Sequence, residues 1–203
     1  MSIIIAGIHT GIGKTVCSAV ICQALGYDYW KPVQAGELEN SDSVFIQKNV
    51  SNPSCTIHPE TYRLQTAASP HFSAGTDGIE IKKEQFVLPV TSNNIVVETA
   101  GGLMSPLANN FLNIDLIEQL QLPVILVAAN YLGSINHTLL SYSALQNRKI
   151  KILGIVFDGE AVKASQQYIL AYTQLPLLFS IPLFKQVNKE TITKFANSIS
   201  INF

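Results

Sequence analysis

A glycine-rich segment near the N-terminus contains the residue types that bind phosphate. Residues 7–15 read GIHTGIGKT and stand between an apolar run and a stretch with apolar residues at helical spacing. Glycines let backbone N–H groups turn toward an anion, Lys14 supplies a positive charge, and the hydroxyl of Thr15 suits Mg²⁺. Strand, glycine loop and helix thus follow in the order that a phosphate-binding loop requires.

The spacing of this loop differs from the usual GxxxxGK[ST] pattern. Gly7 lies one residue too early and Ile8 occupies the expected glycine position, so the segment reads as a lengthened P-loop. A glycine-rich turn at a strand end is the simpler alternative. The GxGKT ending at a strand-to-helix junction favours the phosphate site.

Three charged residues outside the loop could complete such a site. Glu98 follows the apolar run 95–97 and precedes residues 99–102 (TAGG), which permit close backbone approach to a ligand. Asp42 begins a helical stretch, where capping or dipole compensation is an equal alternative to metal binding. Lys31 ends a short strand in YWKPV; a solvated lysine is the simpler interpretation, and a crevice-facing ammonium the functional one.

The elements that must position these residues follow from hydrophobic patterning. Short, β-branched apolar runs predict buried parallel strands at 3–6, 95–97, 123–129, 152–157 and 177–181, in addition to the short strand that ends at Lys31. Helical spacing predicts helices at 15–25, 41–48, 114–120, 135–146, 161–172 and 189–199, with Gly26 ending the first. Their alternation predicts an α/β fold, a mostly parallel sheet flanked by helices in three layers and P-loop NTPase-like, in a single domain over 1–203. We expect residues 49–94, with many prolines and glycines, to form loops and a cover over the substrate.

Composition narrows the function classes. The chain has 203 residues, a formal net charge of −1 and scattered lysines, so no nucleic-acid partner is expected. Its N-terminal apolar run is too short for a signal peptide or a membrane span, which predicts a soluble cytoplasmic protein without a membrane partner. Its three cysteines have no metal or disulfide spacing and are expected to be reduced.

Taken together, the motifs resemble those of the dethiobiotin synthetase family. The shared features follow the family's order: the lengthened P-loop, the KPV box at 31–33, Ser41-Asp42, the ETAGG segment at 98–102, SPH at 69–71, LGSINH at 132–137, and Ile181-Pro182 after the last strand. The resemblance implies a homodimer that uses Mg²⁺ and ATP. It implies that carbon dioxide forms a carbamate on 7,8-diaminopelargonate, that ATP phosphorylates it to a carbamic-phosphoric anhydride, and that the second amine closes the ureido ring.

The resemblance also assigns roles to individual residues. Lys31 and Lys14 become the catalytic lysines, and Thr15, Asp42 and Glu98 surround Mg²⁺. The diamine is assigned to Lys31, Ala35, Gly101, Leu132 and Asn136, the last two at a two-fold interface next to the neighbouring subunit's substrate. The positions assigned to the nucleotide are Gly11, Ile12, Gly13, Lys14, Thr15, Val16, Asp42, Glu98, Thr99, Ala100, Gly101, Asp158, Gly159, Pro182, Leu183 and Phe184.

Some positions depart from the family pattern. Ala35 stands where some members have a serine or threonine, Thr99 replaces the commoner glycine, and Gly11 replaces an acid. Asp158 occupies the place of an asparagine that contacts adenine. A carboxylate accepts hydrogen bonds but cannot donate one to a ring nitrogen, which leaves the base selectivity open.

Two other classes of protein share parts of this pattern. A regulatory P-loop ATPase of the partitioning or cell-division type usually has a second lysine in the loop and often a C-terminal membrane helix, and neither is visible here. A ligase of the amidotransferase type would need an added glutaminase domain. His9, His71 and His137 are weak candidates for catalysis, and we expect His58 to lie on the surface.

Overall fold

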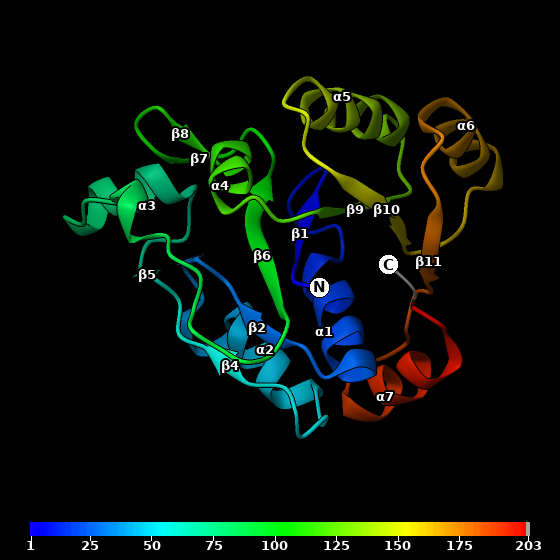
Figure 1. The fold of residues 1–203 in the computed structure, drawn as a ribbon, viewed down its shortest axis with the longest axis horizontal. Coiled ribbons are helices and arrows are strands. Elements are labelled where there is room, and N and C mark those ends of the chain that lie inside the picture. Colours follow the sequence, from blue (N-terminus) through cyan, green and yellow to red (C-terminus); the bar gives the residue numbers. More distant parts are fainter. Residues whose placement is uncertain (202–203) are drawn as a thin grey trace.

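A computed structural model describes residues 1–201 and has a seven-stranded parallel sheet at its centre (Figure 1). The strand order is β11-β10-β9-β1-β6-β2-β4, and every neighbouring pair is parallel. The strands are β1 (Ile3–Gly7), β2 (Asp28–Trp30), β4 (Ile57–His58), β6 (Ile95–Gly102), β9 (Val124–Ala129), β10 (Ile152–Asp158) and β11 (Leu177–Ile181). The predicted α/β class with a parallel sheet is confirmed.

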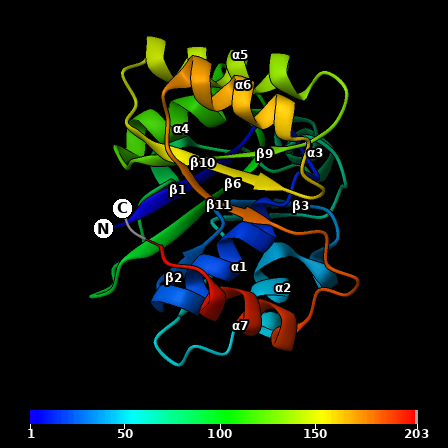
Figure 2. The same cartoon turned by 90° about the vertical axis from the view of Figure 1, so that its right-hand side faces the viewer.

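Helices cover both faces of the sheet and make the three layers that the pattern predicts (Figure 2). On one face lie α1 (Lys14–Leu25), α2 (Asp42–Asn49) and α7 (Lys189–Ser198), where Val20, Ile46 and Ile192 are fully buried. On the other lie α4 (Asn113–Leu120), α5 (Ser134–Asn147) and α6 (Lys163–Thr173). Since both faces are covered, the central strands are apolar throughout instead of alternating.

The end of α1 shows how the sequence sets an element boundary. Gly26 has φ 66° and its N–H bonds the carbonyl of Cys22, as the predicted C-terminal glycine should. The opposite end begins at Lys14, directly after the glycine loop. The helix therefore points its N-terminus at the carboxyl edge of the sheet.

Two expectations about element boundaries need correction. The strand predicted at 95–97 continues to Gly102 in β6, because Ile5 of β1 pairs with Glu98 and Gly7 pairs with Gly102. Residues 49–94 are more regular than expected. They contain β4, β5 (Tyr62–Leu64) and α3 (Pro70–Asp77), and β5 pairs in parallel with β3 (Val33–Ala35).

A small apolar cluster explains why this segment is ordered. Val33, Leu64, Phe86 and Leu107 are each 1% exposed or less and pack together beside the main sheet. The remaining elements of this part are the 3₁₀ turns η1 (Leu38–Asn40) and η2 (Lys83–Gln85) and the antiparallel pair β7 (Pro106–Ala108) and β8 (Phe111–Leu112). β3 and β7 follow β2 and β6 directly in the chain, so this part of the molecule borders the carboxyl ends of those two strands, where Lys31 and Gly101 are found.

Among the helices in residues 1–201, none combines the length and the hydropathy that crossing a bilayer requires.

Candidate active site

The glycine loop between β1 and α1 is closely packed. Gly11 and Gly13 have φ 70° and 85°, in the left-handed region that favours glycine. A Cβ added to Gly7 would lie 2.8 Å from Cδ1 of Ile12 and 2.9 Å from Cδ of Lys14. A side chain at position 7 would therefore force Ile12 and Lys14 to shift, so glycine suits the close return of the loop over its own lysine.

Lys14 lies inside the curve of this loop. Its side chain is buried and Nζ donates a hydrogen bond to the carbonyl oxygen of His9 at 3.0 Å. Burial lowers the pKa of Lys14 to about 8, although the negative charge of Glu98 acts in the opposite direction. Most of the ammonium is still protonated at pH 7, so Lys14 can neutralise an anion held by the loop.

Thr15 connects the two carboxylates expected at this edge of the sheet. Its Oγ1 lies 2.8 Å from Oδ1 of Asp42 and 2.8 Å from Oε1 of Glu98. A hydroxyl has one proton, so it donates to only one of them at a time. The tertiary structure thus brings together three oxygen-bearing side chains that are far apart in the chain.

Glu98 is fixed from a second direction. It is 1% exposed, and its Oε2 accepts hydrogen bonds from Ser18 Oγ at 2.8 Å and from Tyr29 Oη at 3.0 Å. These bonds satisfy a buried carboxylate that would otherwise be costly. Its Oε1 remains oriented toward Thr15.

Asp42 has a partner that its position in sequence does not predict. The N-terminal cap of α2 is Ser41, whose Oγ accepts from the N–H of Val44, and Asp42 is the first helical residue. Its Oδ2 forms an ion pair with Nζ of Lys31. Asp42 therefore does not cap its helix, and it joins the lysine to the Thr15 cluster.

Lys31 follows β2 directly and its side chain is 9% exposed. Burial lowers its pKa, and the negative charges of Glu98 and Glu60 oppose that effect. The solvated-lysine alternative does not hold, because this ammonium is buried against Asp42.

A cavity of about 430 Å³ opens beside Lys31. It brings together three of the residues assigned to the diamine: Lys31, Ala35 and Gly101. Its other lining residues are Thr10, Val33, Gln34, Asp42, Ala68, Ser69, Pro70, Ala100 and Ser105. Ala35 contributes no polar side-chain atom, so hydrogen bonding near that position falls to neighbours such as Gln34 and Ser69.

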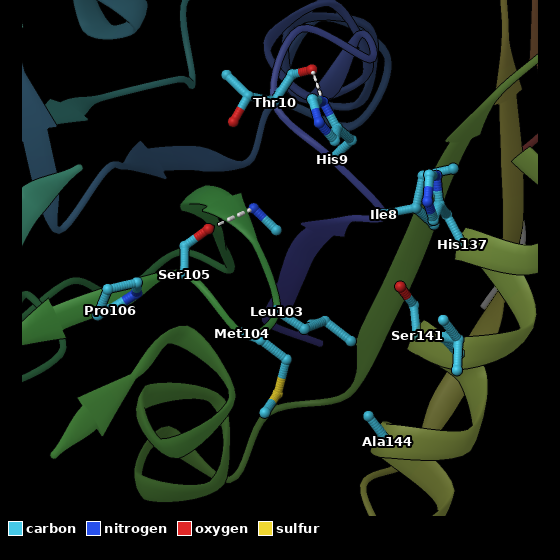
Figure 3. A pocket seen from close by; sticks show the side chains of 12 residues that line it. Ile8, His9, Thr10, Leu103, Met104, Ser105, Pro106, His137, Ser141 and Ala144 are labelled. Carbon is cyan, nitrogen blue, oxygen red and sulfur yellow. Dashed lines mark hydrogen bonds between the residues drawn. The ribbon is translucent and has the colours of Figure 1, made fainter. Parts of the chain in front are cut away.

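A second cavity of about 450 Å³ adjoins the first, since Thr10 and Ser105 line both (Figure 3). In this view His137 and Ser141 of α5 face the turn that carries Leu103 and Met104. The Oγ of Ser105 accepts a hydrogen bond from the N–H of Gly102 at 3.1 Å, which holds that turn in place. A ligand longer than the first cavity could extend into the second.

Leu132 and Asn136 lie elsewhere. They line an apolar groove of about 530 Å³ between α5 and α6, together with Tyr131, Gly133, Ile135, Leu139, Ser165 and Tyr168. Leu132 is fully exposed. Within one chain the structure does not bring these two residues to the cavity beside Lys31.

The positions assigned to the nucleotide base fall into two groups. Asp158 ends β10, and its carboxylate lies so near the loop that a Cβ on Gly13 would meet Oδ2 at 2.5 Å. Burial raises the pKa of Asp158. Gly159, Pro182 and Leu183 line an adjoining cavity of about 480 Å³.

At other positions assigned to the nucleotide, the side chain packs against the protein itself. Phe184 packs edge-on against Phe195, with ring centroids 5.6 Å apart. Ile12 and Val16 pack into the core under α1, so only their backbone can face a phosphate. Thr99 donates to the carbonyl of Ile5 at 3.3 Å, which gives its hydroxyl a structural partner.

Several residues at the site were not predicted from sequence. Thr10, Ser18, Tyr29 and Ser105 all contact it, and only Ser18 had a sequence signal, since it lies one helical turn after Lys14. The surface expectation for His58 is wrong. Its Nε2 lies 3.0 Å from Oδ2 of the buried Asp28, and its side chain is 14% exposed.

Comparison with known proteins gives one consistent group of relatives. The family described as AAA domain matches residues 1–191. The ATP-dependent dethiobiotin synthetases of Brucella ovis and Brucella abortus are each 43% identical to the chain over 201 residues, which cover 99% of this chain and 93% of theirs.

Solved structures of similar shape are more distant in sequence. A ParA family ATPase from Chlorobium tepidum has a TM-score of 0.59 at 11% identity and covers 98% of this chain and 99% of its own. The septum site-determining protein MinD in complex with Mg-ADP, from Pyrococcus horikoshii, has a TM-score of 0.58 at 13% identity, with coverages of 98% and 96%. At these identities the likeness extends to the fold alone, which confirms the P-loop architecture.

Proposed function

Since the chain belongs to the family of ATP-dependent dethiobiotin synthetases, we propose that its ring-forming reaction takes place between the glycine loop and Lys31. The family's activity is ATP-dependent ligation, which closes the ureido ring of dethiobiotin in biotin biosynthesis. The observation that carries the placement is the convergence of Thr15 on Asp42 and Glu98, with Lys31 paired to Asp42. Two lysines and two carboxylates thus meet at the carboxyl edge of the sheet.

The donor set at Thr15 fits Mg²⁺. This ion prefers oxygen ligands, keeps several waters, and is usually held by one or two carboxylates beside phosphate oxygens. Thr15, Asp42 and Glu98 offer a hydroxyl and two carboxylates and no nitrogen or sulfur. Since Mg²⁺ usually takes phosphate oxygens beside one or two carboxylates, the nucleotide's phosphates would complete this donor set. When bound, the ion neutralises phosphate charge.

Lys14 and Lys31 provide the fixed cations of the mechanism. Transfer of a phosphoryl group to a carbamate oxygen brings two anions together, and preorganised positive charge stabilises that arrangement most in a site from which water is excluded. Lys14 faces the loop, where phosphate binds. Lys31 borders the 430 Å³ cavity, where it can hold the carbamate.

The cavity beside Lys31 is where we place the two amines of 7,8-diaminopelargonate. Holding both amines close to the carbamate carbon lets ring closure proceed as an intramolecular step. The adjoining cavity leaves room for the aliphatic chain.

For the nucleotide, we propose that the glycine loop binds the phosphates and that Asp158 lies at the base. The cavity bordered by Gly159, Pro182 and Leu183 adjoins Asp158 at the ends of β10 and β11. A carboxylate accepts from an exocyclic amine, so Asp158 sets a limit on which bases are tolerated.

A homodimer would explain where Leu132 and Asn136 act. Exposed apolar side chains lie on α5, on the turn before it and on α6, among them Leu132, Leu140, Tyr168 and Tyr172. A surface of this kind is typical of a contact with a second subunit. A monomeric mass at the working concentration, with full activity, would contradict this proposal.

Cytoplasmic location and independence from nucleic acid and membrane remain part of the proposal. They rest on the ATP dependence of the family, the net charge of −1 and the scattered lysines. The switch-ATPase alternative rests on the fold alone, because the ParA and MinD structures are 11% and 13% identical to the chain.

The direct test is product formation. The purified protein, incubated with the diamine, bicarbonate and Mg-ATP, is expected to yield dethiobiotin by mass spectrometry and to release phosphate rapidly only when the diamine and bicarbonate are both present. Equal ATP turnover without the diamine would contradict the proposal and favour a regulatory ATPase.

A further inference from the structure

Glu60 is a buried carboxylate outside the cluster of Thr15, Asp42 and Glu98. It lies in the link between β4 and β5, and its side chain is 3% exposed. Its Oε2 accepts a hydrogen bond from Nη1 of Arg63 at 3.0 Å, whereas Oε1 is buried and has no hydrogen-bond partner within residues 1–201. A buried carboxylate oxygen without a hydrogen-bond partner destabilises the folded protein, so its presence suggests a functional role for Glu60.

The strand register places this link beside Lys31. β2 and β4 run in parallel with Trp30 opposite His58, and β3 and β5 continue with Val33 opposite Tyr62. Between these pairs the N–H of Tyr62 bonds the carbonyl of Pro32 at 3.1 Å. Residues 59–61 therefore run alongside residues 31–32, and Glu60 has no intervening strand between it and the lysine.

The charges around Lys31 come from several elements. Asp42 of α2 is in direct contact, Glu98 lies on β6, and Lys14 at the start of α1 adds a like charge. The strand register places Glu60 on the segment that runs directly beside the one bearing Lys31, so its carboxylate adds a further negative charge to this region.

Asp42 alone is a poor permanent partner for Lys31. Its carboxylate already accepts from Thr15, and the proposed function asks the same group to hold Mg²⁺. A lysine paired only with Asp42 would compete with that cation.

We propose that Glu60 is a positioning residue for Lys31. The unpartnered oxygen of Glu60 offers the ammonium a second acceptor when the lysine leaves Asp42. Arg63 holds the other oxygen and so fixes the direction of the carboxylate. Its guanidinium also donates to the carbonyl of Leu38, which anchors it to the turn before α2. This inference rests on the role proposed for Lys31.

The variant Glu60→Gln tests this role because it keeps the size of the side chain and removes its charge. From the interaction energies typical of neighbouring groups in one network, we expect Glu60→Gln to lower kcat roughly tenfold. The KM for Mg-ATP should stay within about twofold of the parent, since the glycine loop is untouched. Glu80→Gln is the matched control, because Glu80 is 79% exposed, pairs with Lys82 at 3.4 Å and should show parent kinetics.

Arg63→Gln separates positioning from a simple structural ion pair. Arg63 is the hydrogen-bond partner of Glu60, yet its own charge lies outside the site. We expect it to keep kcat within about threefold, a smaller loss than that of Glu60→Gln. Equal losses in both variants, or parent kcat in Glu60→Gln, would overturn the proposal. If Glu60→Gln does not fold, Glu60→Asp replaces it, and must lose more kcat than Arg63→Gln.

Coupling to Lys31 is measured without turnover, as the calorimetric affinity for the diamine in the presence of bicarbonate. In the parent, Glu60→Gln should weaken this affinity about tenfold, and in the Lys31→Ala background it should cause no further loss beyond about twofold. The same loss in both backgrounds would show that Glu60 acts independently of the lysine. Parent activity of Lys31→Ala alone would instead refute the proposed function, so the two failures are distinguishable.

Discussion

The sharpest prediction concerns the positive charge of Lys31. The substitution Lys31→Met keeps most of the apolar stem and removes the ammonium. The side chain is 9% exposed and that of its partner Asp42 is 29% exposed, so the change falls on a pair that is largely but not fully buried. The variant therefore tests charge more than packing.

Two effects of different size follow from this geometry. Loss of one preorganised group that stabilises the transition state costs about 10²–10³-fold in kcat, or about 2.7–4 kcal/mol. The loss in free energy of unfolding should be about 1–2 kcal/mol, between the values typical of an exposed and of a buried ion pair. The loss stays small because Asp42 keeps its contact with Thr15 and partial contact with water. A typical domain has a free energy of unfolding of about 5–15 kcal/mol, so the variant should remain folded.

The assay is steady-state formation of dethiobiotin, together with a melting curve. We expect the fall in kcat with a KM for ATP close to that of the parent, because Lys14 and the loop still bind phosphate. Lys82→Met is the matched control, since Lys82 is 57% exposed and pairs with Glu80 at 3.4 Å. A Lys31→Met enzyme with kcat within twofold of the parent would refute the reasoning.

Three further predictions follow from the described contacts. Asp42→Asn and Glu98→Gln should each raise the Mg²⁺ concentration needed for half-maximal activity far more than they weaken nucleotide binding. If the magnesium titration of either variant coincides with that of the parent enzyme, the substituted residue is not a metal ligand. Gly13→Ala should abolish nucleotide binding in an equilibrium titration, because the new Cβ would clash with the carboxylate of Asp158 and because φ is 85° at this position, a conformation that alanine disfavours. Adding Asp158→Ala removes the clash but leaves the backbone strain, so the double variant should recover only part of the nucleotide affinity. Asp28 contributes to stability in a pH-dependent way. Burial raises its pKa, but hydrogen bonds from its neighbours outweigh burial, so the pKa in the folded protein is lowered. The stability that Asp28 contributes is therefore fully present above its unfolded pKa of about 3.9 and is lost as the pH falls through the lower folded value. Melting temperatures of the parent and Asp28→Asn should therefore differ at pH 7 and converge toward pH 2, and a constant gap would contradict this.

Local patterning was sufficient for the parts of the fold that follow from local physics. Unalternating apolar runs require a sheet covered on both faces, and β1, β9, β10 and β11 form at or near the predicted bounds. The glycine loop, its lysine and the C-terminal glycine of α1 are likewise local, because each depends on the backbone freedom or charge of adjacent residues. The single-domain organisation stays a prediction.

Order within residues 49–94 was missed for a physical reason. Proline and glycine signals mark the ends of elements, but they do not reveal packing against a distant surface. Pro70 begins α3 as the first helical residue instead of breaking it, and Gly78 ends it at φ 68°. The cluster around Phe86 and Leu107 supplies the burial that makes this segment regular.

What the sequence determined by itself was therefore the order of the elements and the residue types that they carry to the proposed site. Lys14, Thr15 and Glu98 are candidates by type and neighbourhood, because phosphate and Mg²⁺ demand those types, whereas Asp42 could equally have capped its helix. Only the tertiary structure decided their partners, since parallel strands bring segments far apart in the chain to one edge of the sheet. At that edge Asp42 pairs with the ammonium of Lys31 instead of capping its helix, and one oxygen of the Glu60 side chain is buried without a partner within residues 1–201. Leu132, in contrast, lies on a surface away from the cavity of Lys31.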